Sequence, residues 1–260
     1  VSPRFGMLFD LPDVSGQIYA NASRTFEPPL MLELNSLTVP GFIDIEGQSA
    51  WQFELGTRGR ITGLAWDVAV SDVELRNEIL NANVQPFPGA AFTVPTYRNA
   101  AKTRHYGLEA GLEYQIPGNL FTSRLGGDWL TLRGAYTFAQ YRFVEDSTFE
   151  GNDIPGAPHH QLSAELRYSH PSGFSLGPII EWVPGTYFVD SGNTTTNRGW
   201  FLLSARADWD IGSTGLSAFL QARNLTDTNR ATSVQVDNAN GRYYEPVDGR
   251  SIYAGLRFSR

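Results

Sequence analysis

The fold is decided by one stretch near the end of the chain, Ser251-Ile252-Tyr253-Ala254-Gly255-Leu256-Arg257-Phe258. Ile252, Ala254, Leu256 and Phe258 share one face, and the intervening residues share the other. This period of two predicts a β-strand. Because only two residues follow it, no cap or tail is expected to cover its edge, and the strand must pair with another strand.

The same alternation recurs upstream, and we expect about eleven strands. They are expected at 4–10, 16–23, 50–56, 60 into the seventies, 106–116, 129–143, 161–168, 174–182, 201–209, 216–224 and 251–258. Tight turns are expected at 11–13, 57–59, 170–173 and 211–214, with a moderately long connection near 120. Long loops are expected at 24–49, 81–101, 144–158, 190–198 and 225–249.

Short and long connections alternate along this series. In an antiparallel up-and-down meander, alternation places every long loop at one end and every short turn at the other. A soluble β-sandwich has no reason to segregate its loops in this way. A transmembrane β-barrel of the outer membrane does have one, because its periplasmic turns are short and its extracellular loops long.

Composition further limits the class of protein to which the chain can belong. The chain has 260 residues, a formal net charge of −7 and no cysteine. The acidic balance disfavours nucleic acid as a partner, and the lack of cysteine excludes a disulfide framework and a thiolate metal site. No apolar run is long enough for a transmembrane helix, and any signal peptide is expected outside this sequence. The mean hydropathy of −0.26 fits a soluble protein and also a barrel with a wet lumen.

The two faces of the expected strands differ in chemistry. One face is rich in Leu, Val, Ala and aromatic residues, and Trp51, Trp66, Trp182 and Trp209 all fall on it. The other face carries charges in the middle of strands, which a dry core cannot hold. We therefore expect a lipid face with interfacial aromatic girdles and a polar lumen. The charged positions are Glu54, Asp67, Glu109, Glu113, Arg133, Glu165, Arg167, Arg206, Asp208 and Arg257.

An odd number of strands is a difficulty for a complete barrel. Bacterial single-chain barrels have even strand numbers, and an unpaired edge cannot lie in lipid. Either the count is wrong by one, or the chain is part of a larger barrel.

Short motifs occur in a telling order along the chain. They are Ser23-Arg24-Thr25-Phe26-Glu27-Pro28-Pro29, Trp51-Gln52-Phe53-Glu54-Leu55-Gly56-Thr57-Arg58-Gly59, Thr103-Arg104-His105-Tyr106-Gly107-Leu108-Glu109, Asn224-Leu225-Thr226-Asp227, and Arg242-Tyr243-Tyr244-Glu245-Pro246 followed by Gly249-Arg250 and the closing strand. In this order and spacing the chain resembles the carboxyl-terminal half of a TonB-dependent outer-membrane receptor of the siderophore type. Thr226 replaces the usual aromatic, and Ser259 and Arg260 follow Phe258 where such receptors end in an aromatic.

The resemblance implies a 22-stranded barrel with a plug in its lumen, of which residues 1–260 would be the second half. The plug domain, the segment that contacts TonB and the first strands would lie outside these residues. The implied partners are a ferric siderophore or related small ligand, the TonB complex and outer-membrane lipid, with no nucleic acid. The implied role is a receptor rather than an enzyme, without a cofactor. Its long loops would face the outside of the cell.

Ligand-binding candidates come from the expected loops, since aromatic and Arg side chains can stack on and pair with an anionic or catecholate ligand. The competing interpretation is that these side chains pack the loops or belong to the girdles. The candidates are Tyr97, Arg98, Tyr141, Tyr187, Tyr243 and Tyr244.

Other functions stay open at this point. A metal site at His159 and His160 is disfavoured, because neighbouring strand residues point to opposite faces and no third ligand is suitably spaced. A complete small porin or a lipid-acting barrel enzyme would need ten to twelve strands, roughly the number expected here. The enzyme would also need paired His and Ser, and no such Ser follows His105. A soluble carbohydrate-binding β-protein is a third class. Siderophore, haem, cobalamin and glycan all remain as ligands of a receptor.

Overall fold

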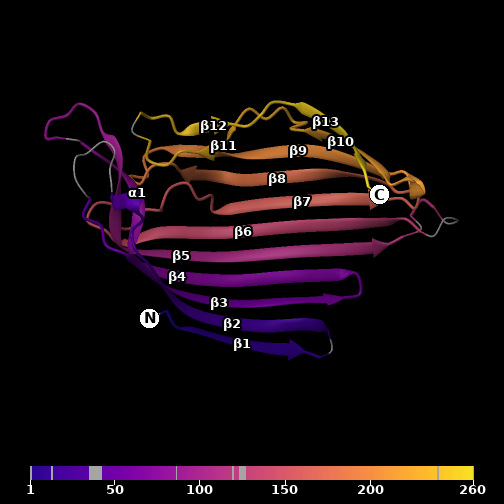
Figure 1. Ribbon diagram of the computed structural model, residues 1–260, viewed down its shortest axis with the longest axis horizontal. Coiled ribbons are helices and arrows are strands. Elements are labelled where there is room, and N and C mark those ends of the chain that lie inside the picture. The colour runs from indigo at the N-terminus through magenta and orange to yellow at the C-terminus, as the bar shows by residue number, and fades with distance from the viewer. Residues whose placement is uncertain are drawn as a thin grey trace.

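The computed structural model describes residues 2–12, 14–34, 43–85, 87–118, 120–122, 127–238 and 240–259, and it forms one antiparallel sheet of eleven strands (Figure 1). Each strand pairs with the next along the chain, in the order β1 to β10 and then β13. The strands are β1 Arg4–Leu11, β2 Ser15–Glu27, β3 Gln48–Ile61, β4 Leu64–Val84, β5 Val94–Pro117, β6 Trp129–Glu145, β7 His160–Ser169, β8 Phe174–Phe188, β9 Thr196–Asp210, β10 Leu216–Arg223 and β13 Ser251–Phe258.

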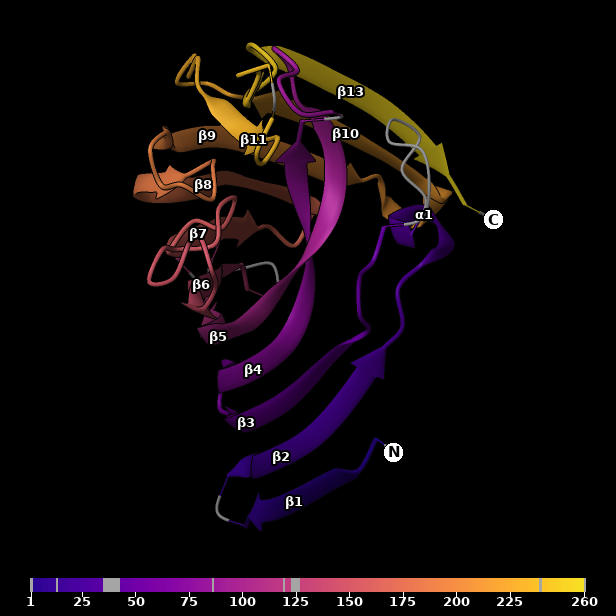
Figure 2. The ribbon, with the colours of Figure 1, turned by 90° about the vertical axis from the view of Figure 1, so that its left-hand side faces the viewer.

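The sheet curls into an open trough. Figure 2 looks along it and shows the strands on an arc, with β1 and β13 at its two free margins. Among the described residues, the pairing partner of β13 is β10 and that of β1 is β2. The expected strand number is confirmed.

The connections alternate between two ends of the trough, which we call the long-loop end and the short-turn end (Figure 1). The segregation by length is incomplete, because the connection at 118–128 lies at the short-turn end and is longer than those at 85–93 and 189–195. Residues 119 and 123–126 of this connection lie outside the described residues. The turn predicted at 57–59 is wrong. Strand β3 continues to Ile61, which pairs with Leu64, and Gly63 takes the positive φ of 79° that the tight turn requires.

The loop predicted at 81–101 is also wrong in its bounds. Strands β4 and β5 stay paired as far as Val84 and Val94. Asn81, Asn83 and Pro95 indicated a loop, but the backbone there forms a long hairpin. A strand that projects beyond the apolar belt has no reason to keep an alternating apolar pattern, and so the sequence signal failed.

Two of the long connections contain structure that alternation did not predict. A short helix α1, Met31–Leu34, follows β2, and a small two-stranded sheet, β11 Ala231–Val234 with β12 Tyr244–Pro246, lies within the connection between β10 and β13. A 3-10 turn, η1 Gly212–Thr214, joins β9 to β10. Residues 35–42 of the predicted loop at 24–49, and Asp13 of the turn predicted at 11–13, lie outside the described residues.

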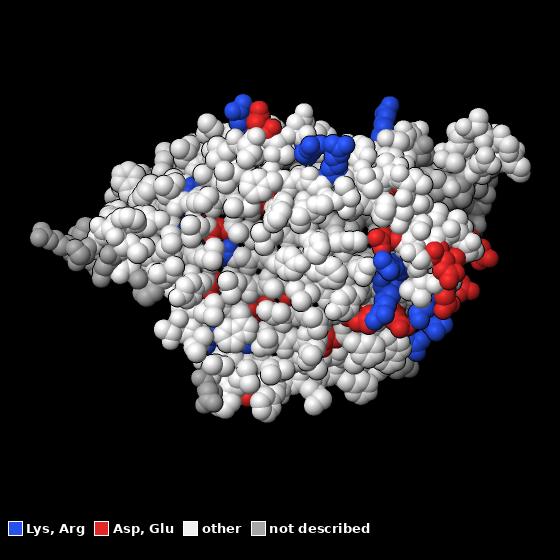
Figure 3. All heavy atoms as spheres, turned by 180° about the vertical axis from the view of Figure 1, so that it is seen from behind, with Lys and Arg blue, Asp and Glu red and all other residues white. Residues whose placement is uncertain are grey.

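Cross-strand register confirms the two faces, because residues directly opposite each other in antiparallel strands point the same way. Leu55, Val70, Leu108 and Phe138 form one apolar row. Figure 3 views the convex side, which is nearly free of charged residues over most of its area. The predicted charged face is therefore the concave one. No helix among the described residues is long and apolar enough to cross a membrane.

Aromatic residues on the convex face lie at two levels. Tyr106 and Tyr114 on β5, Phe174 and Trp182 on β8, and Phe201 and Trp209 on β9 are each separated by the same number of positions. At a rise of about 3.3 Å per residue these pairs are about 26 Å apart along the strand. That separation suits the apolar band of an outer-membrane barrel, about 25 Å tall, between its aromatic girdles.

Tight packing occurs at the long-loop end rather than between layers. Val183, Tyr187 and Val189 form a buried cluster against Trp200, Val234 and Tyr243. A second buried side chain, Phe143, lies near the end of β6. The eleven strands thus form a single layer, while the loops have a small core of their own.

Candidate functional site

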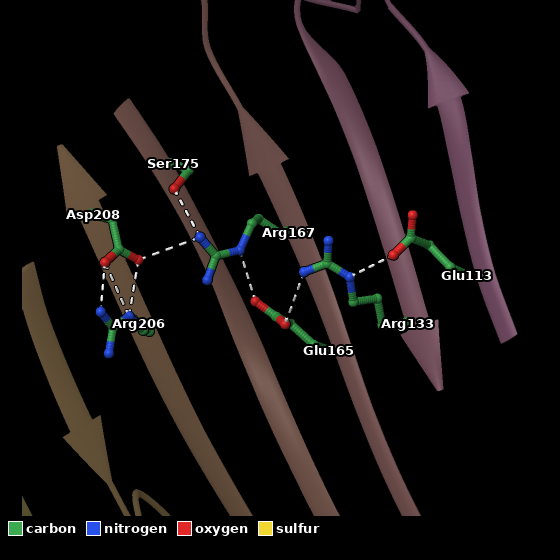
Figure 4. Close-up of polar contacts among 7 residues, drawn as sticks. All are labelled: Glu113, Arg133, Glu165, Arg167, Ser175, Arg206 and Asp208. Atoms are coloured by element: carbon green, nitrogen blue, oxygen red, sulfur yellow. Dashed lines mark hydrogen bonds and ion pairs between the residues drawn. The ribbon is translucent and has the colours of Figure 1, made fainter. Parts of the chain in front are cut away.

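A row of alternating charges crosses the concave wall, and we call it the charge ladder: Glu113, Arg133, Glu165, Arg167, Asp208 and Arg206 (Figure 4). Glu113 and Glu165 are the direct neighbours of Arg133 on the flanking strands β5 and β7. Register therefore brings opposite charges together on successive strands.

The ladder is continuous from β5 to β9. Arg133 Nε donates to Glu113 Oε2 at 2.8 Å, and its Nη1 lies 3.8 Å from Glu165 Oε2. Arg167 Nε donates to Glu165 Oε1 at 2.7 Å, and its Nη1 lies 3.3 Å from Asp208 Oδ2. Arg206 Nη2 closes the series on Asp208 Oδ1 at 2.7 Å. These side chains are partly exposed, so the row forms a polar, hydrated wall on which a polar surface can rest.

Above this wall, side-chain to backbone hydrogen bonds tie the connections of the long-loop end together, and we call this arrangement the loop frame (residues 146–159, 189–195 and 235–238). Asp190 accepts from the backbone N–H groups of Thr194 and Thr195. Asp237 accepts from Ser191 through both its N–H and its hydroxyl, each at 2.7 Å. The loops are thereby held as one unit rather than as independent segments.

The tip of the β4–β5 hairpin joins the same unit. Asn83 Nδ2 donates to the backbone carbonyl of Asp237, and in Figure 2 the hairpin rises across the mouth of the trough toward β11. Asn152 donates to the carbonyl of Ser191 at 2.9 Å, which links the connection after β6 to the one after β8. Segments far apart in sequence thus meet around one opening.

Asp146 anchors the first loop of the frame. It accepts from Arg98 Nη1 at 2.6 Å and from the backbone N–H groups of Thr148 and Phe149, each at 2.9 Å. Burial alone would raise the pKa of Asp146, but these donors outweigh it, and the pKa lies below its ordinary value. The carboxylate is therefore held in its charged form.

Four of the predicted ligand residues lie on strands rather than in loops, so their predicted placement is wrong. Tyr97 and Arg98 belong to β5, Tyr141 to β6 and Tyr187 to β8. For Tyr97, Arg98 and Tyr187 the cause is that the paired strands extend beyond their expected ends, whereas Tyr141 lies within the strand already expected at 129–143.

The remaining two candidates lie at the small sheet. Tyr243 precedes β12 and packs on the cluster that contains Tyr187, and the ring centroid of Tyr244 is 6.1 Å from that of Tyr243. Burial raises the pKa of Tyr243, and the nearby carboxylates of Asp190 and Asp237 add to the effect.

Several of the candidates are already engaged in packing. Tyr187 is 5% exposed, and its hydroxyl accepts from Asn197 Nδ2 at 2.9 Å. Arg98 lies over the rings of Phe143 and Phe149, at 5.5 and 5.1 Å from their centroids. Tyr141 stacks on His105 at 4.3 Å. Tyr244, 48% exposed, offers more free surface than Tyr187, although its hydroxyl donates to the carbonyl of Thr196.

Sequence reasoning missed the residues that build the frame. Asp146, Asp190 and Asp237 are the carboxylates on which its loops close. Aspartate followed closely by Ser or Thr, as in Asp146-Ser147-Thr148 and Asp190-Ser191, is a signal for side-chain to backbone turns that could have identified two of them.

The two adjacent histidines have separate partners. His159 Nε2 lies 3.3 Å from Asp153 Oδ2, and His160 Nδ1 lies 2.8 Å from the hydroxyl of Tyr136. Within the described part of the chain, no group of three or more His, Asp and Glu side chains could hold a metal ion.

Comparison with known proteins decides the family. The family model described as "TonB dependent receptor-like, beta-barrel" matches residues 1–225. The chain belongs to the TonB-dependent receptor β-barrel family. Members of this family are β-barrel proteins of the bacterial outer membrane.

Similar proteins and structures agree with this assignment. The ferrioxamine B receptor of Salmonella typhimurium (strain LT2) is 37% identical over 108 residues, which cover 38% of this chain and 15% of that receptor. The copper transporter OprC has a similar fold, with a TM-score of 0.78 and 16% identity over 99% of this chain and 39% of that one. The ferric citrate transporter FecA gives a TM-score of 0.70 and 20% identity over 98% of this chain and 37% of that one.

These relatives are much longer than this chain, which matches well under half of their length. They are named as receptors and transporters rather than enzymes. The family assignment thus favours the receptor reading over the small porin, the barrel enzyme and the soluble β-protein.

Proposed function

We propose that residues 1–260 form the carboxyl-terminal half of a 22-stranded barrel in a receptor for TonB-dependent uptake of a ferric siderophore. The observation that carries the proposal is the open eleven-stranded trough with a charged concave wall. Two unpaired edges in a membrane require further strands, and a charged wall requires a polar occupant. A plug domain from the same receptor, which would contact the TonB complex, supplies that occupant in this proposal.

In this proposal the chain has a defined orientation in the outer membrane. With the closing strand ending in the periplasm, the loop frame faces the outside of the cell and surrounds the entrance to the lumen. Because the loops are already tied together, little conformational entropy is lost when a ligand binds, and this favours a preformed vestibule. Of the six aromatic and Arg candidates, we propose that Tyr97 and Tyr244 contact ligand, whereas Arg98, Tyr141, Tyr187 and Tyr243 hold the vestibule in shape.

The ligand class rests on a relative that is 37% identical over 108 residues and is named a receptor for ferrioxamine B. A hydroxamate siderophore is therefore the first ligand to test. Catecholate chelates and citrate are the next, since receptors for a ferric catecholate and for ferric citrate have the same fold.

Radioiron uptake tests the proposal. The full-length receptor is expressed in cells that lack their own siderophore receptors, and uptake is measured from ferrioxamine B, a ferric catecholate and ferric citrate. We expect uptake from one of these chelates that disappears when the tonB gene is deleted. Uptake that persists without TonB, or conductance of the 260-residue chain alone as a closed pore, would support the small-porin alternative instead.

The ligand residues need a separate readout. Tyr244→Phe and Tyr97→Phe retain the ring, whereas Tyr244→Ala and Tyr97→Ala remove it. We expect the alanine variants to weaken binding of the transported chelate, measured by quenching of Trp fluorescence in the purified receptor. Unchanged affinity in both alanine variants would remove these residues from the site.

A further inference from the structure

An aromatic pair lies at the small sheet, at the mouth of the trough (Figure 2). Tyr243 and Tyr244 meet edge to face, with ring centroids 6.1 Å apart and an interplanar angle of 68°. Tyr243 packs on the buried cluster that contains Tyr187, whereas Tyr244 is 48% exposed. The hydroxyl of Tyr244 donates to the carbonyl of Thr196 at 2.9 Å. The ring of Tyr244 is therefore held in place, and the part of it that is available to a ligand is its face rather than its hydroxyl.

Two carboxylates of the loop frame lie beside this pair. The backbone N–H of Asp237 donates to the carbonyl of Val189 at 3.0 Å, which brings Asp237 next to Asp190. The backbone N–H of Gln235 donates to the carbonyl of Tyr243 at 2.8 Å, which brings both segments to the aromatic pair. Burial raises the pKa of Tyr243, and the charges of Asp190 and Asp237 raise it further. A negative field therefore reaches the rings.

Little positive charge balances these two carboxylates. Neither Asp190 nor Asp237 forms an ion pair within the described part of the chain. The segments 189–195 and 235–245 have one basic residue between them, Arg242, which is exposed. Both carboxylates already accept hydrogen bonds from backbone N–H and hydroxyl groups, so they act on a ligand through their charge. An exposed aromatic face thus lies in a region of negative potential.

We propose that the ring of Tyr244 and the charges of Asp190 and Asp237 form a site for an organic ammonium group of the transported chelate. The proposal rests on the uptake function proposed above and narrows its ligand to a cationic iron chelate with a terminal amine. The face of an aromatic ring attracts a cation, and carboxylates nearby strengthen the attraction. An ammonium group is compact enough to lie on one ring, and its charge is balanced without displacing the hydrogen bonds of the two carboxylates. The same field repels an anionic chelate.

Two chelates that differ only at the amine test the proposal. One is ferrioxamine B, whose terminal amine is protonated at neutral pH, and the other is its N-acetyl derivative, which has no charge at that position. Both are titrated into the full-length receptor in a neutral detergent, and binding is measured by quenching of Trp fluorescence. We expect the amine form to bind about tenfold more tightly, which corresponds to about 1.4 kcal/mol. The preference should shrink as salt is added.

The variant Asp190→Asn/Asp237→Asn removes both charges and keeps a side-chain oxygen that can accept from the backbone. We expect it to reduce the preference for the amine form to about twofold or less. Loosened loops would weaken both chelates, so the ratio of the two affinities isolates the effect of charge. The single variants should each show part of this loss, which keeps the test valid if the double variant does not fold.

Substitutions at the ring and at a distant acid complete the set. Tyr244→Ala should reduce the preference, whereas Tyr244→Phe should retain it, because the cation binds to the ring rather than to the hydroxyl. Asp248→Asn is the matched control, since it removes an exposed charge from the same connection, and it should retain the full preference. Heat-modifiable gel mobility verifies that each variant is folded.

Two results would overturn the ammonium site and leave the transport proposal in place. They are equal affinities of the unaltered receptor for the two chelates, and an undiminished preference in Asp190→Asn/Asp237→Asn. Binding of neither chelate, together with binding of ferric citrate or a ferric catecholate, would contradict the hydroxamate ligand class and the ammonium site alike. Loss of TonB-dependent uptake of every chelate would count against the transport proposal itself, so the two failures can be told apart.

Discussion

Arg98 and Asp146 form the tightest ion pair of the loop frame, with 2.6 Å between Nη1 and Oδ2 and an Asp146 side chain only 2% exposed. The pair joins the projecting part of β5 to the loop that follows β6. Phe143 and Phe149 cover the guanidinium group, so water has little access to the bond. The geometry of the vestibule therefore depends on a contact that no ligand needs to touch.

Replacing Asp146 should loosen this loop locally. In Asp146→Asn the partly buried guanidinium of Arg98 loses its charged partner, which costs about 2 kcal/mol. Amide exchange in residues 146–153 should then be about thirtyfold faster by hydrogen–deuterium exchange of the full receptor. Glu150→Gln, which alters an exposed acid of the same loop, is the control and should leave exchange unchanged.

The same contact predicts a dependence on pH. Since the folded pKa of Asp146 is lowered, its contribution to stability is fully present above the ordinary Asp pKa and is lost as the pH falls through the lowered value. Exchange in this loop should accelerate on going from about pH 5 to about pH 2, after correction for intrinsic rates. Asp146→Asn should show no such step; a step of equal size in the variant would assign the effect to another group.

Glycine on the concave wall makes room for an aromatic ring on the next strand. The ring of Tyr19 lies over Gly56, and a Cβ added there would collide with it. Gly56→Ala should destabilise the receptor by about 1 to 3 kcal/mol, because the ring must move. Gly111→Ala is the control, since a Cβ there would lie at an ordinary 3.7 Å from the carbonyl of Asp67. Urea unfolding in lipid vesicles measures both, and equal midpoints would contradict the prediction.

The centre of the charge ladder should matter more than isolated charges beside it. Glu165 is shared by Arg133 and Arg167, so Glu165→Gln leaves two guanidinium groups with like charge and one fewer acceptor. We expect a loss of about 1 kcal/mol, reduced at high salt, because the pairs are partly exposed. Glu181→Gln changes a concave-wall acid for which the described residues provide no ion pair, and it should have a smaller effect in the same unfolding experiment.

The alternation of apolar and polar residues predicted most of the fold, and there is a physical reason why the prediction failed elsewhere. Leu108, Ala110 and Leu112 share the convex face while Glu109 and Glu113 share the concave face, so the pattern within the belt is unambiguous. Beyond the belt both sides are wet, and Asn81 and Pro95 then resemble a loop although they are paired. The same reason misplaced Tyr97 and Arg98.

The site was harder to predict because its residues act through distant partners. The bonds from Asn83 to Asp237 and from Asn152 to Ser191 join positions with no local relationship in sequence. The sequence around an aromatic residue such as Tyr187 looks the same whether its ring contacts a ligand or packs in a small core. Only the three-dimensional contacts distinguish those roles.

The two free margins of the trough have one more consequence, which concerns assembly. Every neighbouring pair of the eleven strands is antiparallel, so β1 and β13 run in the same direction. Neither premature circularisation nor union of two copies lying the same way up in the membrane could join these margins by antiparallel bonding. In the proposed barrel of 22 strands, eleven further strands between these margins would let every neighbouring pair stay antiparallel.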